Sequence, residues 1–304
     1  MLIRVDDDMK RSLTFGTAPK RVVSLVPSDT FSVAALGCGS ALVGRTDYCE
    51  LPAEVVANVP SVGGTKNPNL EAILDLSPDL VIANQEENTK KDLETLAQKG
   101  VKVLVAFPKR AADGIAHLAR LARIFYLERD PVVRELLLRG YTAIREAEEA
   151  RKTVTPLRTF CPIWMKPLMT INGATFISDI LDLAGAQNVF ADRERRYPLA
   201  ADLGTAPALS AEDVAGRDTR YPRVTLDEVT ARAPELVLLP DEPHPFSEED
   251  AAVFRSLDIP AAKRDAVVRT GGKDLCWYGA QTIEGLPRLR ALVAAFRAES
   301  VAPS

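Results

Sequence analysis

The chain has 304 residues, 46% of them hydrophobic, and its 38 basic and 42 acidic side chains give a formal net charge of −4. This length suits about two globular domains. The acidic balance argues against nucleic acid as a partner, because that affinity comes mainly from clustered Lys and Arg side chains. Apolar runs stay short of the ~18 residues that a membrane-spanning helix needs, so no direct membrane insertion is expected.

Short apolar runs alternate with helical patterns in the first half of the chain. Residues 2–5 and 12–15 are expected to be strands, and the acidic run from Asp6 to Asp8 between them is interpreted as a solvated hairpin turn. Residues 21–26 predict a strand, followed by a helix that Ser28 caps and that stops at Gly37. Two more strands are expected at residues 80–83 and 101–107, with a helix between them that Asn88 caps and that runs to Lys99.

Residues 131–152 carry apolar side chains at helical spacing and predict one long helix of about 33 Å. The alternation then begins again, with strands expected at residues 157–163 and 236–239 and helices at residues 175–184 and 226–233. This order predicts an α/β fold of two Rossmann-like lobes with parallel sheets, joined by one long backbone α-helix. The expected boundaries are 1–127 for the N-terminal lobe, 128–155 for the helix and 156–304 for the C-terminal lobe.

The two halves contain a repeat. Residues 70–82 align without a gap on residues 226–238, and each stretch predicts a helix, a Pro-acid corner and a buried strand. Glu71 and Asp227 occupy equivalent positions in the first turns of these helices. The carboxylates either stabilise the positive end of the helix dipole or are exposed for arginines of a partner, and the residues alone leave both interpretations open.

Two lobes held by a stiff connector predict a ligand-binding cleft between them, and open α/β sheets bind ligands beyond the carboxyl ends of their strands. Loops expected at those ends are rich in aromatic and polar side chains. Aromatic rings with a polar handle suit a large, partly flat ligand. The candidate ligand-binding residues are Tyr48, Thr65, Lys66, Asn67, Asn84, Glu86, Trp164, Lys166, Arg196, Tyr197, Tyr221, Lys273, Asp274, Trp277 and Tyr278.

Enzyme motifs are missing from the sequence. Neither glycine-rich phosphate-binding pattern occurs, and the only two histidines are His117, in a helical pattern, and His244, between two prolines. Two separated histidines give neither a nucleophile with its base nor a three-histidine zinc site. Four distant cysteines without a Cys-x-x-Cys pair are expected to be reduced thiols. We therefore expect no catalytic residue and no metal site.

Several of these segments resemble one known family. Residues 21–37 (R-V-V-S-L-V-P-S-D-T-F-S-V-A-A-L-G), residues 43–48 and both copies of the repeat resemble the substrate-binding proteins of cobalamin and iron-siderophore ABC importers. The resemblance covers residues 1–297. It implies a non-enzymatic, monomeric receptor without a resident cofactor, whose ligand is a cobalt corrinoid or a ferric chelate. It also implies that Tyr48 faces the ligand and that Glu71 and Asp227 dock to the ABC permease.

The sequence departs from the cobalamin-binding members in three places. Residues 65–67 and Asn84 are polar where those receptors commonly have tryptophans, and the segment 199–220 is longer than the usual connection. Residues 1–8 turn acidic before a hydrophobic signal segment forms, so a cytoplasmic location is expected, or an extracytoplasmic one if a leader was removed. The alternative function is therefore a cytoplasmic protein or enzyme that handles a corrinoid, a tetrapyrrole or another metabolite with the same fold.

Overall fold

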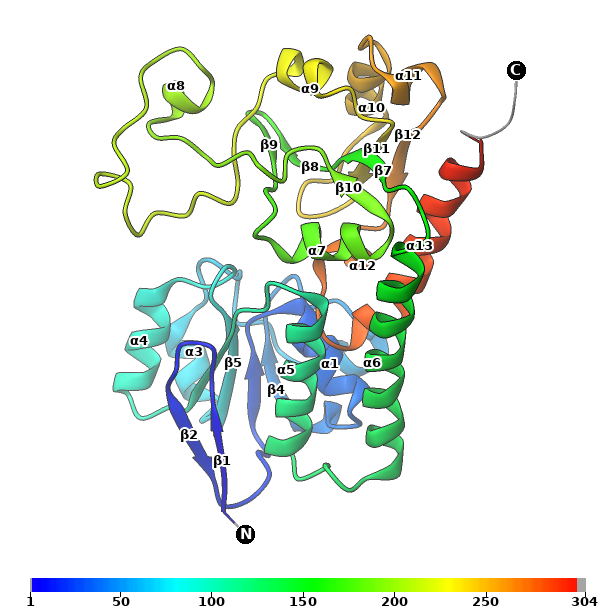
Figure 1. Cartoon of the computed structure of the whole chain (residues 1–304). Coiled ribbons are helices and arrows are strands. Elements are labelled where there is room, and N and C mark those ends of the chain that lie inside the picture. The colour runs from blue at the N-terminus through cyan, green and yellow to red at the C-terminus, as the bar shows by residue number, and fades with distance from the viewer. Residues whose placement is uncertain (1, 300–304) are drawn as a thin grey trace. The chain divides into compact units, whose positions relative to one another are not determined.

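The computed structural model describes residues 2–299, which form two compact units (Figure 1). Unit 1 comprises the chain up to Thr142 together with Trp277–Ile283, and unit 2 comprises Ala143–Cys276 and the chain from Glu284 onward. The chain passes from unit 1 to unit 2 inside the long helix α6 (Pro131–Arg151), and again inside α13 (Ala280–Glu299). Each unit has its own parallel sheet, which confirms the predicted fold class.

Unit 1 is built on a four-stranded parallel sheet in the order β4-β3-β5-β6. All five residues of the central strand β5 are buried, because helices cover both faces of the sheet. The strands are β3 (Val22–Ser24), β4 (Leu42–Arg45), β5 (Leu80–Asn84) and β6 (Val103–Ala106). The helical segments are α1 (Pro27–Ala35), η1 (Gly39–Ala41), α2 (Ala53–Val56), α3 (Leu70–Asp75), α4 (Lys90–Gln98) and α5 (Ala111–Ile124).

The N-terminal hairpin consists of β1 (Ile3–Asp6) and β2 (Ser12–Phe15), as expected. The interpretation of its acidic turn as solvated holds for Asp6, which is exposed, but is wrong for Asp7, which is only 4% exposed. The Asp7 carboxylate accepts hydrogen bonds from the backbone N–H of Arg11 (2.9 Å) and of Val105 (3.3 Å), and Asp8 accepts one from Phe107 (2.6 Å). The two acids therefore fasten the hairpin to β6 and the loop that follows it.

Two predicted helix caps are also wrong. The first residue before α1 is Val26, and Ser28 is buried in the first turn without capping it. Thr89 caps α4 by accepting a hydrogen bond from the backbone N–H of Asp92. Asn88 is buried instead, and its amide donates to the carbonyl groups of Leu25 and Thr65, which ties two loops to the end of the sheet.

Unit 2 contains a second parallel sheet in the order β10-β7-β11-β12. The strand predicted over residues 157–163 is two strands, because Pro162 has no N–H to donate and the chain leaves the sheet there. The strands are β7 (Leu157–Phe160), β8 (Pro162–Met165), β9 (Leu168–Thr170), β10 (Ala186–Asn188), β11 (Leu236–Pro240) and β12 (Val267–Thr270). The helices are α7 (Phe176–Leu183), α8 (Leu199–Asp202), α9 (Leu226–Arg232), α10 (Glu248–Arg255), α11 (Pro260–Lys263) and α12 (Lys273–Cys276).

The sequence repeat corresponds to α3 with β5 in unit 1 and to α9 with β11 in unit 2. In unit 1, β3 lies between the edge strand β4 and the repeated strand β5. In unit 2, β7 lies in the same way between the edge strand β10 and the repeated strand β11. The residue before each corner proline has the same left-handed backbone, with φ of 46° at Ser77 and 44° at Ala233. The two units are therefore built alike.

The repeat extends to the contacts that close each corner. The guanidinium of Arg21 donates to the carbonyl of Leu76 at the end of α3, and that of Arg158 donates to the equivalent carbonyl at the end of α9. The corner acids Asp79 and Glu235 accept hydrogen bonds from the backbone N–H groups of these two arginines. None of the helices between residues 2 and 299 combines the length and the apolar character that spanning a bilayer requires.

Candidate functional site

In unit 1, the loops that follow the strands present a small set of exposed side chains. Tyr48, after β4, is 63% exposed. Lys66 and Asn67 are exposed in the next loop, and the Lys66 ammonium contacts the backbone carbonyl of Glu86. Thr65 is buried, and its carbonyl accepts a hydrogen bond from Asn88. Tyr48 and Lys66 thus both lie in the connection after β4, and Lys66 contacts the loop that follows β5, another strand of the same parallel sheet.

Other predicted ligand residues of unit 1 lie in its interior. Asn84, Trp277 and Tyr278 are only 3%, 6% and 5% exposed. The side-chain oxygen Oδ1 of Asn84 accepts a hydrogen bond from the backbone N–H of Glu86 at 2.7 Å. The side-chain amide nitrogen of Asn84 donates to the Tyr278 hydroxyl at 3.2 Å. Glu86 is half-buried. These contacts give Asn84 and Tyr278 a packing role that their positions in the sequence did not reveal.

Tyr278 belongs to a buried polar cluster with Asp29 and His117. The Tyr278 hydroxyl donates to one Asp29 oxygen at 2.7 Å, and His117 Nε2 lies 2.9 Å from the other. Burial, together with the charge of Asp29, raises the pKa of Tyr278 well above its ordinary value. His117 is on α5, Asp29 on α1 and Tyr278 in the segment that returns to unit 1. The cluster therefore fastens the returning segment, and sequence reasoning did not identify Asp29.

In unit 2, the exposed aromatic group is Trp164, which is 43% exposed on β8. Its ring lies 5.2 Å from that of His244, and His244 in turn lies 4.6 Å from Phe246. The indole N–H donates to the Lys166 carbonyl at 3.1 Å, which fixes the orientation of the ring. The Asp250 carboxylate lies 3.5 Å from His244 Nε2, and hydrogen bonding from the Ser247 backbone lowers the pKa of Asp250. Trp164 is thus a supported aromatic platform.

The charged candidates of unit 2 fall into two groups. Lys273 forms an ion pair with Glu242 at 3.4 Å, and Asp274 forms one with Arg288 at 2.6 Å. Lys166 and Arg196 are exposed, and neither side chain has an ionic partner in the part of the chain that the structure describes. Lys166 and Arg196 are therefore better placed than the paired residues to contact the polar groups of a ligand.

Arg196, Tyr197 and Tyr221 lie on a long segment between β10 and α9 that extends away from the sheet of unit 2 (Figure 1). The returning part of this segment pairs with β9, since the backbone N–H of Thr170 donates to the Pro222 carbonyl at 3.0 Å. The Tyr197 hydroxyl donates to the Asp218 carbonyl at 2.8 Å, and its ring is half-buried. The segment is therefore held at its base and carries an internal contact farther out.

The two acids of the repeat are exposed and equivalent in structure. Glu71 and Asp227 are each the second residue of a helix, two positions after the residue that caps it. Asn69 and Thr225 cap these helices with their own side chains, so the carboxylates are not needed as caps. Neither carboxylate has a hydrogen bond or ion pair within residues 2–299.

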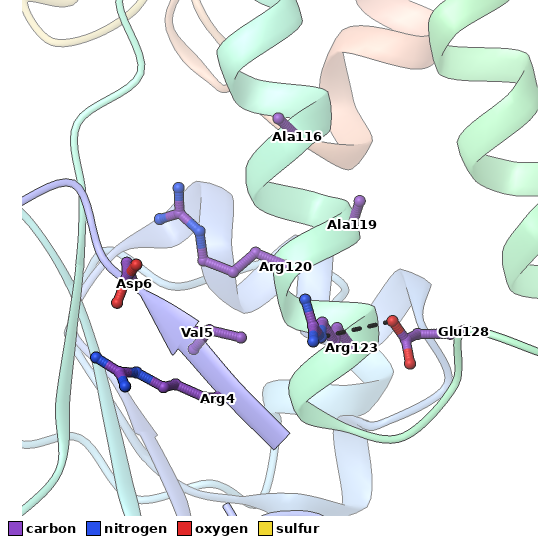
Figure 2. Close-up of a pocket in the computed structure, with 8 residues that line it drawn as sticks. All are labelled: Arg4, Val5, Asp6, Ala116, Ala119, Arg120, Arg123 and Glu128. Carbon is purple, nitrogen blue, oxygen red and sulfur yellow. Dashed lines mark ion pairs between the residues drawn. The ribbon is translucent and has the colours of Figure 1, made fainter. Parts of the chain in front are cut away.

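A groove of about 420 Å³ in unit 1 contains none of the predicted site residues (Figure 2). It lies between β1 and α5, and Figure 2 shows Arg123 paired with Glu128 at one end. The Arg123 guanidinium and the Glu128 carboxylate are 3.6 Å apart. Arg120, also in its lining, pairs with Asp8 at 2.6 Å. Among the described residues, no group of His, Cys, Asp and Glu side chains could hold a metal ion.

Two similar units, each with polar and aromatic loops after its parallel strands, are the architecture of a ligand-binding receptor. The sequence profile of the periplasmic binding protein family matches residues 22–238, and the chain belongs to this family. This confirms the family resemblance. The cleft expected between the lobes stays a prediction.

Among curated relatives, the vitamin B12-binding protein of Pectobacterium atrosepticum is 29% identical over 227 residues, covering 73% of this chain and 71% of that protein. The protein of the same name from Pectobacterium carotovorum is 32% identical over 205 residues, covering 62% and 72%. A periplasmic vitamin B12-binding protein of Vibrio cholerae has a TM-score of 0.71 at 21% identity, covering 92% of this chain and 99% of that one. A periplasmic heme-binding protein of Roseiflexus has the same TM-score at 19% identity, covering 93% and 99%. Likeness at this level of identity establishes the shared fold.

Proposed function

We propose that this chain is the substrate-binding protein of an ABC importer and that its ligand is a corrinoid. The observation that carries the proposal is the match to curated vitamin B12-binding proteins at 29% to 32% identity over most of their length. The heme-binding proteins among the structural neighbours make haem the chief competing ligand. Ligand identity must therefore be tested with both classes.

Two exposed rings support a large, partly flat ligand. Tyr48, in the loop after β4 of unit 1, and Trp164, on β8 of unit 2, each expose an aromatic ring. Aromatic faces contribute contact area with little conformational entropy to lose, and they dominate many binding sites. Lys66, Lys166 and Arg196 are exposed in the neighbouring loops and would meet amide, phosphate or carboxylate groups of the ligand. The role is binding without catalysis.

The equivalent acids of the two units support docking to a membrane permease. Glu71 and Asp227 are exposed, form no ion pair with any residue from 2 to 299 and do not cap their helices, which favours the partner interpretation over the helix-dipole interpretation. One carboxylate on each unit would offer one ion pair to each half of a permease. The charges lie outside the ligand-binding loops, so docking and ligand affinity would be separable.

Membership of the periplasmic binding protein family favours action outside the cytoplasmic membrane. The predicted cytoplasmic location has no support from the comparisons. A corrinoid receptor in the extracytoplasmic space would deliver its ligand to the permease, which is consistent with the two unpaired acids.

The test is a set of titrations with cyanocobalamin, cobinamide, haem and a ferric siderophore. We expect both corrinoids to bind, and we expect Tyr48→Ala or Trp164→Ala to weaken that binding about tenfold or more, as for aromatic residues at other interfaces. The control is Tyr141→Ala, which removes a ring that is 47% exposed on α6 and should leave affinity unchanged. Tighter binding of haem or the siderophore would contradict the ligand assignment, and unchanged affinity in both site variants would contradict the site.

A further inference from the structure

The segment between β10 and α9 of unit 2 contains an unusual number of arginines. Its base is closed by Asp202, whose carboxylate is fully buried. This carboxylate accepts hydrogen bonds from the backbone N–H groups of Arg196 at 2.9 Å and Arg223 at 2.7 Å, and from the Arg193 guanidinium at 3.0 Å. The arginines of the segment are Arg193, Arg195, Arg196, Arg217, Arg220 and Arg223.

The acids near this segment neutralise only some of these arginines. Arg193 pairs with Asp202 and with Glu228 at 2.9 Å. Arg220 donates two hydrogen bonds to the Asp218 carboxylate, at 2.6 and 2.9 Å. Arg195 and Arg223 have no carboxylate partner in the chain between residues 2 and 299. Arg196 and Arg217 likewise form no ion pair among the described residues, and the charges of Asp202 and Asp218 still act on Arg223 and Arg195, so what these guanidinium groups lack is a direct carboxylate partner.

Arg223 has unmet hydrogen-bonding capacity. Its side-chain atoms Nε and Nη1 are buried and have no hydrogen-bond acceptor among the described residues. Burial, and then the charge of Arg195, lower the pKa of Arg223. A buried donor without an acceptor destabilises the folded state, and the cost is larger if the donor is charged. An added anion would therefore stabilise Arg223 by accepting the hydrogen bonds that Nε and Nη1 do not make within the described residues.

Arg195 is held beside the same site by Tyr197. The Arg195 guanidinium carbon lies 4.4 Å from the centre of the Tyr197 ring, and that of Arg217 lies 5.1 Å from it. A ring face fixes the direction of a guanidinium and leaves its edge N–H groups free to donate. The segment begins at the carboxyl end of β10, on the side of an α/β sheet where ligands bind.

We propose that Arg195 and Arg223 form an oxyanion site that takes a phosphate or carboxylate group of the bound ligand. Planar guanidinium groups donate paired hydrogen bonds to such groups, and the anion supplies the acceptors that Arg223 lacks and a direct ion-pair partner for both side chains. The identity of the ligand rests on the proposed function, whereas the anion site itself is testable without that ligand.

The first test measures thermal unfolding of the full chain in inorganic phosphate and in sodium chloride of equal ionic strength. We expect phosphate to raise the midpoint of the wild type and to have no such effect on Arg223→Gln or Arg195→Gln. In chloride, Arg223→Gln should unfold at the same temperature as the wild type or above it, because an unpaired buried charge is removed. The control is Arg255→Gln, which removes an exposed arginine that is paired with Glu248 elsewhere in unit 2 and should keep the phosphate effect.

No phosphate effect in the wild type, or an undiminished effect in Arg223→Gln, would overturn the site. A clear loss of stability of Arg223→Gln in chloride would show a structural role instead and would also overturn it. These outcomes do not depend on whether the chain binds a corrinoid.

The second test identifies the source of the anion. Cyanocobalamin carries a phosphodiester, haem carries two carboxylates, and cobinamide carries neither. An approximately tenfold loss in Arg223→Gln for cyanocobalamin alone would assign the phosphodiester, and a loss for haem alone would assign a carboxylate. An equal loss that includes cobinamide would overturn the assignment to an oxyanion of the ligand.

Discussion

Replacing Tyr278 by Phe removes one hydroxyl from the buried cluster of unit 1. This hydroxyl donates to an Asp29 oxygen at 2.7 Å and accepts from the Asn84 amide at 3.2 Å. Phe keeps the ring, so its edge-on contact with His117, at 5.8 Å between ring centres, is retained. The substitution therefore isolates the hydrogen bonds of the hydroxyl from the packing of the ring.

The expected cost follows from the acceptor. A hydrogen bond to a charged group contributes about 1.5 to 3 kcal/mol, and the Asn84 amide loses its acceptor as well. We expect Tyr278→Phe to lower the free energy of unfolding of unit 1 by about 2 to 4 kcal/mol. The matched control is Tyr126→Phe, because the Tyr126 hydroxyl donates at 2.8 Å to the neutral carbonyl of Phe15 in a partly buried setting. Its expected cost is about 1 kcal/mol.

The assay is urea unfolding followed by tryptophan fluorescence in a Trp164→Phe background. The chain has only two tryptophans, and Trp277 then reports unit 1 alone. If Tyr278→Phe costs no more than Tyr126→Phe, the buried cluster does not hold the returning segment in place and the reasoning fails.

Three further outcomes are expected. Burial raises the pKa of the Cys161 thiol from 9.0 to about 12. The contribution of this thiol to the free energy of unfolding is therefore complete below pH ~9 and falls by up to about 1.4 kcal/mol per pH unit toward pH ~12. Urea unfolding at several pH values should show a weaker dependence on pH in Cys161→Ala than in the wild type. Ala233→Gly should raise the free energy of unfolding of unit 2 by about 1 kcal/mol, measured in urea, because only Gly tolerates φ of 44° without strain. Glu71→Ala combined with Asp227→Ala should abolish association with the cognate permease in a pull-down and leave ligand affinity unchanged.

Each of these outcomes has a control or a contradicting result. Ala231→Gly, inside α9, should have the opposite sign to Ala233→Gly and cost about 1 kcal/mol. Glu54→Ala with Glu249→Ala removes two other exposed acids from first turns and should leave permease association intact. An alkaline dependence that is the same in Cys161→Ala and in the wild type would contradict the assignment to that thiol.

The helices and strands could be predicted from the sequence because their patterns involve residues that are close together in the chain. Residues 70–82 and 226–238 show the same helix, corner and strand, and both form as expected. The contact between Tyr278 and Asp29 joins residues 249 positions apart, and no periodic pattern signals such a contact. Asp7 is likewise held partly from outside its own turn, because the backbone N–H of Val105 on β6 donates to its carboxylate.

The candidate site was predictable as a set of loops but not as a set of exposed side chains. Tyr48 and Trp164 expose their rings, whereas Trp277 and Tyr278 are buried, although all four are aromatic residues in loops or at strand ends. Aromatic side chains fill cores and binding sites alike, so residue type alone does not separate the two. The unsatisfied donors of Arg223 could not be predicted either, because only the structure shows that Nε and Nη1 have no acceptor among the described residues.

The most direct test of the central claim is a calorimetric titration of the purified chain with cyanocobalamin. A corrinoid receptor should bind one molecule per chain with a Kd below ~10 μM, which corresponds to about −7 kcal/mol. Absence of binding at that concentration, or binding of haem at least tenfold tighter under the same conditions, would contradict the account.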